Sequence, residues 1–185
     1  TGRYPSDRHP VFQVYLRQIY LYFWYIWKAE QVTEKHEKGK HMYNLEILEK
    51  GCQELGITLD DTQEHQFIQF YEYLVEKNKV MNLTGITEFD EVLVKHFLDS
   101  LCCVKATDMT KAKKVMDIGT GAGFPGVPLK IAFPHIEACL LDSLNKRVKF
   151  LEETFALLGL ENITAIHGRA EEFAKNKVYR EQYDL

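Results

Sequence analysis

The chain reads Val115-Met116-Asp117-Ile118-Gly119-Thr120-Gly121-Ala122-Gly123-Phe124-Pro125-Gly126 at the point where a short apolar run passes into a glycine-rich loop. The apolar run predicts a buried β-strand. Glycines directly after a strand permit positive φ angles and carry no Cβ atoms, so the backbone can turn tightly and a ligand can approach it closely. The stretch therefore indicates a cofactor site at the carboxyl end of a strand.

Short apolar strands and helices alternate after this loop. The predicted elements are a helix over Gly126–Phe133, a strand over Ala138–Leu141, a helix over Leu144–Leu158 that Gly159 ends, a strand over Ile163–Ile166, and the beginning of a fourth strand at Tyr183–Leu185. Because no hairpin signals separate the strands, we expect parallel strands with right-handed crossovers, the doubly wound α/β arrangement. Sheets of this kind generally have five or more strands, so we expect an incomplete sheet.

Three helices are predicted before the first strand. Leu45–Leu55 has apolar residues at helical spacing and ends at Gly56, and a second helix begins after Asp60 and Asp61. Its predicted apolar face is Phe67, Phe70, Tyr71, Leu74 and Val75. A capping box at Thr87–Asp90 opens the third helix, whose apolar stripe is Phe89, Val92, Leu93, Phe97, Leu101 and Val104.

Residues 1–41 differ from the rest in composition, since they contain both tryptophans of the chain. The run Val11–Trp27 is interrupted by polar residues and is shorter than the roughly 20 residues that span a bilayer, so no membrane segment is predicted. The first methionine is Met42. We therefore expect residues 1–41 to be an aromatic-rich extension or a cloning or gene-calling artefact, with an interaction segment as the alternative. The helical region would follow over residues 42–110 and the α/β region over residues 111–185.

The composition narrows the classes of function. The chain has 185 residues, 45% of them hydrophobic, and a net charge of −4, so any nucleic-acid contact must depend on local basic patches. Its four cysteines have no spacing typical of a metal site. We expect Cys52, Cys102, Cys103 and Cys139 to be reduced thiols in a cytoplasmic protein without a metal.

Asp142 lies 21 residues after Gly121, at the predicted carboxyl end of the second strand. A carboxylate there can accept hydrogen bonds from both hydroxyls of a ribose, so the loop and Asp142 together indicate an adenosine-containing cofactor. Gly121, Gly123 and Gly126 also have the dinucleotide G-x-G-x-x-G spacing. The residues alone therefore leave NAD and S-adenosylmethionine both open. A Walker-type site is disfavoured, because no Lys-Ser or Lys-Thr pair follows the glycines.

Five blocks of sequence carry a resemblance to a known family. They are Asn82-Leu83-Thr84, Lys95-His96-Phe97-Leu98-Asp99-Ser100, Asp117–Gly126, Leu141-Asp142-Ser143-Leu144-Asn145-Lys146-Arg147 and Gly168-Arg169-Ala170-Glu171-Glu172. In order and spacing they resemble the glucose-inhibited division protein B family, bacterial S-adenosylmethionine-dependent methyltransferases of small-subunit ribosomal RNA. The resemblance covers about Met42 to Leu185.

The resemblance implies a Rossmann-like domain that methylates N7 of one guanine in 16S ribosomal RNA, free or within the small ribosomal subunit. It implies that Gly119 and Phe124 of the loop, and Ala170 and Glu171 after the third strand, contact S-adenosylmethionine, with Asp142 near the ribose. Family members continue beyond the residues that match Leu185, so the chain resembles the first half of this domain. The alternatives are an NAD-dependent oxidoreductase on the same loop and an inactive RNA-binding or interaction fragment.

The chemistry implied by the resemblance requires little acid or base catalysis. Guanine N7 has an accessible lone pair and loses no proton on methylation, so alignment of the reactants does most of the work. Asp117 would either favour a cationic cofactor or fix the glycine loop, and His96 would be a core histidine or a substrate contact.

Three basic residues follow the carboxyl ends of predicted strands, the edge of a doubly wound sheet where substrates bind. They are Lys146, Arg147 and Arg169. We expect them to contact RNA phosphates, and the alternative is an ordinary solvated surface.

Overall fold

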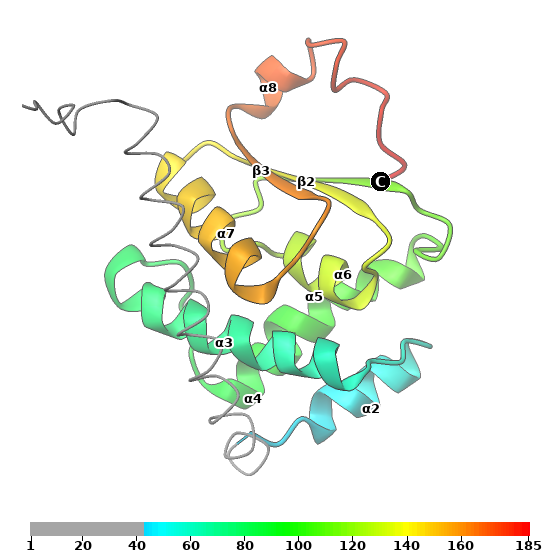
Figure 1. Ribbon diagram of the computed structural model, residues 1–185, viewed down its shortest axis with the longest axis vertical. Helices are drawn as coiled ribbons and strands as arrows, with labels where there is room; N and C mark the ends of the chain where they lie inside the picture. Colours follow the sequence, from blue (N-terminus) through cyan, green and yellow to red (C-terminus); the bar gives the residue numbers. More distant parts are fainter. Residues whose placement is uncertain (1–42) are drawn as a thin grey trace, which may run out of the picture. The chain divides into compact units, whose positions relative to one another are not determined.

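The computed structural model describes residues 43–185, of which residues 45–185 form one compact unit (Figure 1). The expectations for residues 1–41 lie outside the described residues. Within the described part, none of the helices combines the length and the apolar character needed to cross a bilayer. The helical region and the α/β region share one hydrophobic core, and the boundary expected between residues 110 and 111 stays a prediction.

The sheet that the structure describes consists of the parallel strands β1 (Lys114–Ile118), β2 (Glu137–Asp142) and β3 (Ile163–His167), in the order β1-β2-β3. Helix α6 (Gly126–Ala132) joins β1 to β2, and helix α7 (Asn145–Leu158) joins β2 to β3. Figure 1 shows α6 and α7 on one side of the sheet and α8 (Ala170–Phe173) on the other. The predicted parallel α/β fold, with an incomplete Rossmann-like sheet, is confirmed.

The last residues of the chain lie beside the edge of β1 that does not contact β2. The N–H of Asp184 donates to the carbonyl oxygen of Lys114, and the N–H of Met116 donates to that of Leu185, both at 2.8 Å. The Asp184 carboxylate also accepts from the N–H groups of Lys113 and Lys114, at 2.7 and 2.9 Å. Residues 183–185 do not form a strand in the structure, but Asp184 and Leu185 bond to the edge of β1 where the doubly wound order places a fourth strand.

Helix α3 (Asp61–Met81) joins the helical region to both crossover helices. Its N-terminus has a capping box, in which Asp60 and Gln63 each accept the other's backbone N–H through a side-chain oxygen, at 2.8 Å. The amide of Gln63 donates to a carbonyl oxygen of α6, and that of Gln66 donates to the carbonyl oxygen of Leu158 at the end of α7, both at 2.8 Å. The two glutamines therefore satisfy carbonyls that helix C-termini leave unbonded.

The third predicted helix is irregular. It consists of α4 (Phe89–Val92), a π-helical turn η1 (Leu93–Leu98), α5 (Asp99–Leu101) and a 3-10 turn η2 (Cys102–Lys105). The predicted capping box is wrong: the helix begins at Phe89, Glu88 in the N-cap position makes no side-chain capping bond, and Thr87 lies before the cap. The π turn contains His96, and such turns are frequent at functional sites.

The core buries most of the predicted stripes and one residue that the stripes miss, while Phe89 and Val104 of the third stripe are only half-buried. Phe67, Phe70, Leu74, Val92, Leu93, Phe97 and Leu101 are all fully buried. Tyr73 is buried as well, whereas Tyr71 and Val75 are only half-buried. The Tyr73 ring stacks on Phe150 of α7, with centroids 5.6 Å apart and an interplanar angle of 7°. Since α3 packs against α7 as well as η1, its buried face is wider than a single helical stripe.

Lys130 of α6 is a buried cation, 2% exposed. Its Nζ donates to the carbonyl oxygens of Pro134 and Ile136, at 2.8 and 2.5 Å, in the turn that leads from α6 into β2. Burial lowers the pKa of the Lys130 ammonium, and Glu161 partly opposes that shift. The side chain therefore determines the path by which the chain enters β2.

Lys130→Met should lower the free energy of unfolding by about 2 kcal/mol, because two buried carbonyls lose a charged donor. Lys149→Met is the matched control, since Lys149 lies exposed on α7 and its loss should change stability by less than about 0.5 kcal/mol. Urea unfolding of the two variants checks the difference. Equal midpoints would contradict the structural role of Lys130.

Candidate cofactor and substrate site

The glycine loop exposes bare backbone at its first two glycines. Gly119 and Gly121 have φ angles of +78° and +61°. A Cβ atom at Gly119 would meet nothing within 4 Å, and one at Gly121 would meet only the Gly119 oxygen, at 3.9 Å. A ligand can therefore approach this stretch more closely than it could approach any residue with a side chain.

Gly123 and Gly126 face packed side chains instead of open space. A Cβ at Gly123, where φ is +94°, would lie 2.6 Å from Val127 and 3.0 Å from Leu151. One at Gly126 would lie 2.8 Å from both the Asp117 carboxylate and Leu140. These two glycines let α6 begin directly against the sheet, which is the close-packing role that the third glycine of such loops serves.

Asp142, at the end of β2, is aimed at the glycine loop and is only 2% exposed. Its Oδ2 accepts from the N–H of Gly121 at 2.9 Å and from Nη1 of Arg147 at 3.4 Å, while Oδ1 accepts from the N–H of Leu144 at 2.8 Å. The carboxylate thus joins the loop after β1 to the turn after β2. Since Oδ1 accepts one bond, it keeps a lone pair for one further donor.

Asp117 lies beneath the same loop, 8% exposed, and its Oδ2 accepts from the N–H of Gly126 at 2.9 Å. Burial raises the pKa of the Asp117 carboxyl, and the nearby charge of Asp142 adds to this rise, whereas Thr120 and the Gly126 N–H oppose it. The loop therefore lies over two carboxylates, and this environment favours a positively charged ligand.

Phe124 of the loop packs against the helical region. Its ring lies 5.4 Å from that of Phe70 and 6.2 Å from that of Phe97, centroid to centroid. It stacks on the imidazole of His96, with centroids 4.5 Å apart and an interplanar angle of 13°. The helical region thus forms one wall of the glycine loop.

His96 also contacts the segment that follows α3. Its Nε2 lies 2.7 Å from the hydroxyl oxygen of Thr84, and that oxygen accepts from the N–H of Ile86 at 3.0 Å. Burial lowers the pKa of the His96 imidazole, while a hydrogen bond with the Lys95 backbone and the charge of Asp99 partly oppose that shift. His96 is therefore half-buried, its lowered pKa favours the neutral imidazole, and its polar partner makes it more than an apolar core side chain.

Each of the three basic residues expected to contact RNA has a partner within the chain. Lys146 Nζ lies 3.4 Å from the carbonyl oxygen of Met81, and Arg147 pairs with Asp142. Arg169 lies 3.7 Å from the Glu171 carboxylate, in a pair whose side chains are both 72% exposed. Exposed pairs of this kind are weak, so Arg169 remains available to other anions.

Ala170 and Glu171 begin α8, directly after β3. Gly168, two residues before α8, donates its N–H to the carbonyl oxygen of Asp142 at 3.0 Å, so this turn lies at the same sheet edge as the glycine loop. Two large apolar side chains are also exposed at this edge, Ile118 at 61% and Leu144 at 42%. Sequence analysis placed Ile118 in a buried strand and Leu144 at the start of a buried helix stripe, and both predictions of burial are wrong: Ile118 ends β1 and Leu144 is the N-cap of α7.

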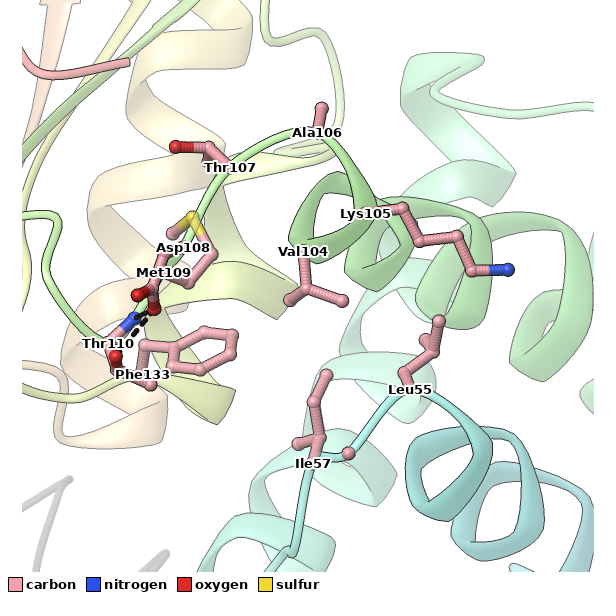
Figure 2. Close-up of a pocket in the computed structure, with 11 residues that line it drawn as sticks. Leu55, Ile57, Val104, Lys105, Ala106, Thr107, Asp108, Met109, Thr110 and Phe133 are labelled. Carbon is pink, nitrogen blue, oxygen red and sulfur yellow. Dashed lines mark hydrogen bonds between the residues drawn. The ribbon is translucent and has the colours of Figure 1, made fainter.

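The described residues also form a pocket at the opposite edge of the sheet from the glycine loop. The pocket, of about 420 Å³, separates residues 104–110, which lead into β1, from the turn between α2 (Glu46–Glu54) and α3. Figure 2 shows Ile57, Val104 and Phe133 facing this pocket. Because it lies at the amino ends of the strands, it is separate from the glycine loop.

All four cysteines are free thiols. Cys52 and Cys139 are buried, and burial raises the pKa of the Cys52 thiol to about 11, so this thiol is a poor nucleophile. Within residues 43–185, no group of three or more histidine, cysteine or acidic side chains is arranged to hold a metal ion.

Residues 63–185 match the GidB family model, which is described as rRNA small subunit methyltransferase G. The chain belongs to the GidB family. The ribosomal RNA small subunit methyltransferase G of Alkaliphilus metalliredigens is 54% identical over 138 residues, which cover 75% of this chain and 58% of that protein. The protein of the same name from Exiguobacterium sp. is 54% identical over 130 residues, covering 70% and 55%, and that from Clostridium tetani is 47% identical over 139 residues, covering 75% and 58%.

This GidB-family chain therefore spans a little more than half the length of these curated relatives. The resemblance on which the sequence analysis relied is confirmed. The matched residues include the whole site, from Thr84 and His96 to the glycine loop and Asp142.

His96 should make the stability of this GidB-family chain depend on pH. The ordinary imidazole pKa is near 6.5 and the folded-state pKa is lower, so below about pH 6.5 the unfolded chain binds more protons and stability falls as pH drops through the folded-state pKa. His96→Gln should make the decrease in melting temperature between pH 7.5 and pH 5.5 smaller. Identical decreases in the two proteins would contradict a neutral, partly desolvated imidazole.

Proposed function

We propose that the protein to which this chain belongs transfers a methyl group from S-adenosylmethionine to N7 of a guanine in 16S ribosomal RNA. One observation carries the proposal: bare loop backbone at Gly119 and Gly121 lies beside the buried carboxylate of Asp142, at the carboxyl edge of a parallel sheet. Relatives named as ribosomal RNA methyltransferases favour this cofactor over NAD.

The residues at this edge fit an adenosyl cofactor. Gly119 and Gly121 leave space for a ligand against the main chain, and the remaining lone pair of Asp142 Oδ1 suits one ribose hydroxyl. The exposed side chains of Ile118 and Leu144 offer apolar surface to a purine ring. Ala170 and Glu171 begin the next turn along the same edge and complete the proposed binding surface.

The charges beneath the loop suit the methyl donor. S-adenosylmethionine supplies a methyl group on a positively charged sulfur. Asp117 and Asp142 place negative charge under the loop, and Arg147 partly balances that of Asp142. We propose that Asp117 both fixes the start of α6 and contributes to this negative potential.

The chain's residues mainly have to bind and orient the reactants. N7 of guanine has a free lone pair and no proton to lose, so no side chain has to act as a base. No described thiol is needed as a nucleophile either, which fits the buried positions of Cys52 and Cys139. The role of residues 43–185 is then to hold the cofactor and one side of the RNA.

We further propose that RNA, free or within the small subunit, approaches this edge of the sheet. The Arg169 side chain is 72% exposed, against 32% for Arg147, and Lys146 lies next to the segment that carries Thr84. Arg147 is partly occupied by Asp142, so its contribution to RNA binding is the smallest of the three. Four unpaired thiols are compatible with a cytoplasmic location.

Gly119→Ala should weaken binding of S-adenosylhomocysteine at least about tenfold, because the new methyl group occupies the space proposed for the cofactor. Gly56→Ala is the matched control: Gly56 has a φ of +72°, and a Cβ there meets nothing within 4 Å. Both variants carry a similar backbone strain of about 1 kcal/mol, but only Gly119→Ala changes the proposed cofactor site. Isothermal titration calorimetry measures the dissociation constants.

Equal affinity of the two variants, or wild-type binding of NAD but not of S-adenosylhomocysteine, would contradict the proposal. A second measurement follows incorporation of labelled methyl groups into 16S RNA and into assembled small subunits. Cofactor binding without methyl incorporation would favour an RNA-binding or interaction fragment as the function of this chain alone.

A further inference from the structure

We propose that His96 is a positioning residue for the cofactor site: its ring, oriented by the Thr84 hydroxyl, holds Phe124 of the glycine loop in place. The proposal rests on the proposed function, since it concerns the same loop. It adds a residue that does not touch the cofactor but acts on it through Phe124.

The first support is a rigid attachment of Thr84. The side-chain oxygen of Asn78 in α3 accepts from the N–H groups of Leu83 and Thr84, at 2.6 and 2.9 Å, and its amide donates to the Thr84 carbonyl oxygen at 2.9 Å. The Thr84 hydroxyl oxygen accepts from the Ile86 N–H. The hydroxyl that contacts His96 is therefore fixed by the end of a 21-residue helix.

The second support is the geometry of the ring contact. The Nε2 atom of His96 lies 2.7 Å from the Thr84 hydroxyl oxygen. The His96 ring stacks nearly parallel on the Phe124 ring, with centroids 4.5 Å apart. The ring contacts of Phe124 with Phe70 and Phe97 are longer and tilted, at interplanar angles of 39° and 45°. Of these three rings, His96 makes the closest and most nearly parallel contact with Phe124.

The third support is the flexibility of the loop itself. Phe124 follows three glycines with positive φ, whose backbone has more conformational freedom than any other. Asp142 holds the middle of the loop at Gly121, and His96 holds its end at Phe124. Fixing both points restricts the loop that carries the bare backbone of Gly119 and Gly121 before the cofactor binds, which lowers the entropic cost of binding.

A double-mutant cycle on binding of S-adenosylhomocysteine tests the proposal, with dissociation constants from calorimetry and melting temperatures as a check of folding. His96→Gln should weaken binding about fivefold to tenfold, and Phe124→Leu should weaken it as well. If His96 acts through Phe124, adding His96→Gln to Phe124→Leu should cause no further loss. Thr84→Val should weaken binding about threefold, while Thr84→Ser, which keeps the hydroxyl, should bind like the wild type.

His135→Gln is the matched control, because His135 also contacts a phenylalanine ring and one carbonyl oxygen, but at the opposite edge of the sheet. Additive effects of His96→Gln and Phe124→Leu, or wild-type affinity in both His96→Gln and Thr84→Val, would overturn the proposal. If His96→Gln fails to fold, the Thr84 pair decides alone. Failure of the wild-type chain to bind would instead contradict the proposed function.

Discussion

The buried carboxylate of Asp142 is the constraint on which the rest of the site depends. It accepts hydrogen bonds from the glycine loop after β1 and from the turn after β2, and it pairs with Arg147 of α7. A charge that is only 2% exposed is stable only when several donors compensate for its lost hydration. The glycine loop, the turn after β2 and the Arg147 guanidinium supply those donors. The carboxylate thereby holds the carboxyl ends of β1 and β2 at a fixed separation.

The helical region is part of the site as well as a cover for the sheet. Gln63 and Gln66 of α3 bind the C-terminal ends of α6 and α7, and the aromatic cluster around Phe97 reaches the loop at Phe124. The loop is therefore held on one side by a carboxylate of the sheet and on the other by rings of the helical region. The boundary between residues 110 and 111, predicted where helices give way to alternating strands and helices, stays a prediction, and the residues on its two sides contribute to one hydrophobic core.

The sequence alone predicted the parallel strands, the glycine loop and the position of Asp142, because each depends on local pattern or on spacing along the chain. The sequence predicted neither the hydrogen-bond partners of Asp142 nor the burial of Lys130 and Tyr73, because these depend on contacts between segments far apart in the sequence. The irregular helix from Phe89 to Lys105 was missed for a related reason: helical periodicity does not distinguish a π turn from an α-helical one. His96 could be named from its block of sequence, but its contacts with Thr84 and Phe124 required the fold.

The most direct test of the central claim, that the loop held by Asp142 binds the adenosyl cofactor, is nuclear magnetic resonance of the ¹⁵N-labelled chain during titration with S-adenosylhomocysteine. The account predicts that the amide signals of Gly119, Gly121 and Leu144 shift together and saturate at one ligand per chain. Signals of residues 104–110, at the pocket on the opposite edge, should stay unchanged. Shifts confined to residues 104–110, or no shift of Gly119 and Gly121 at saturating ligand, would contradict the account.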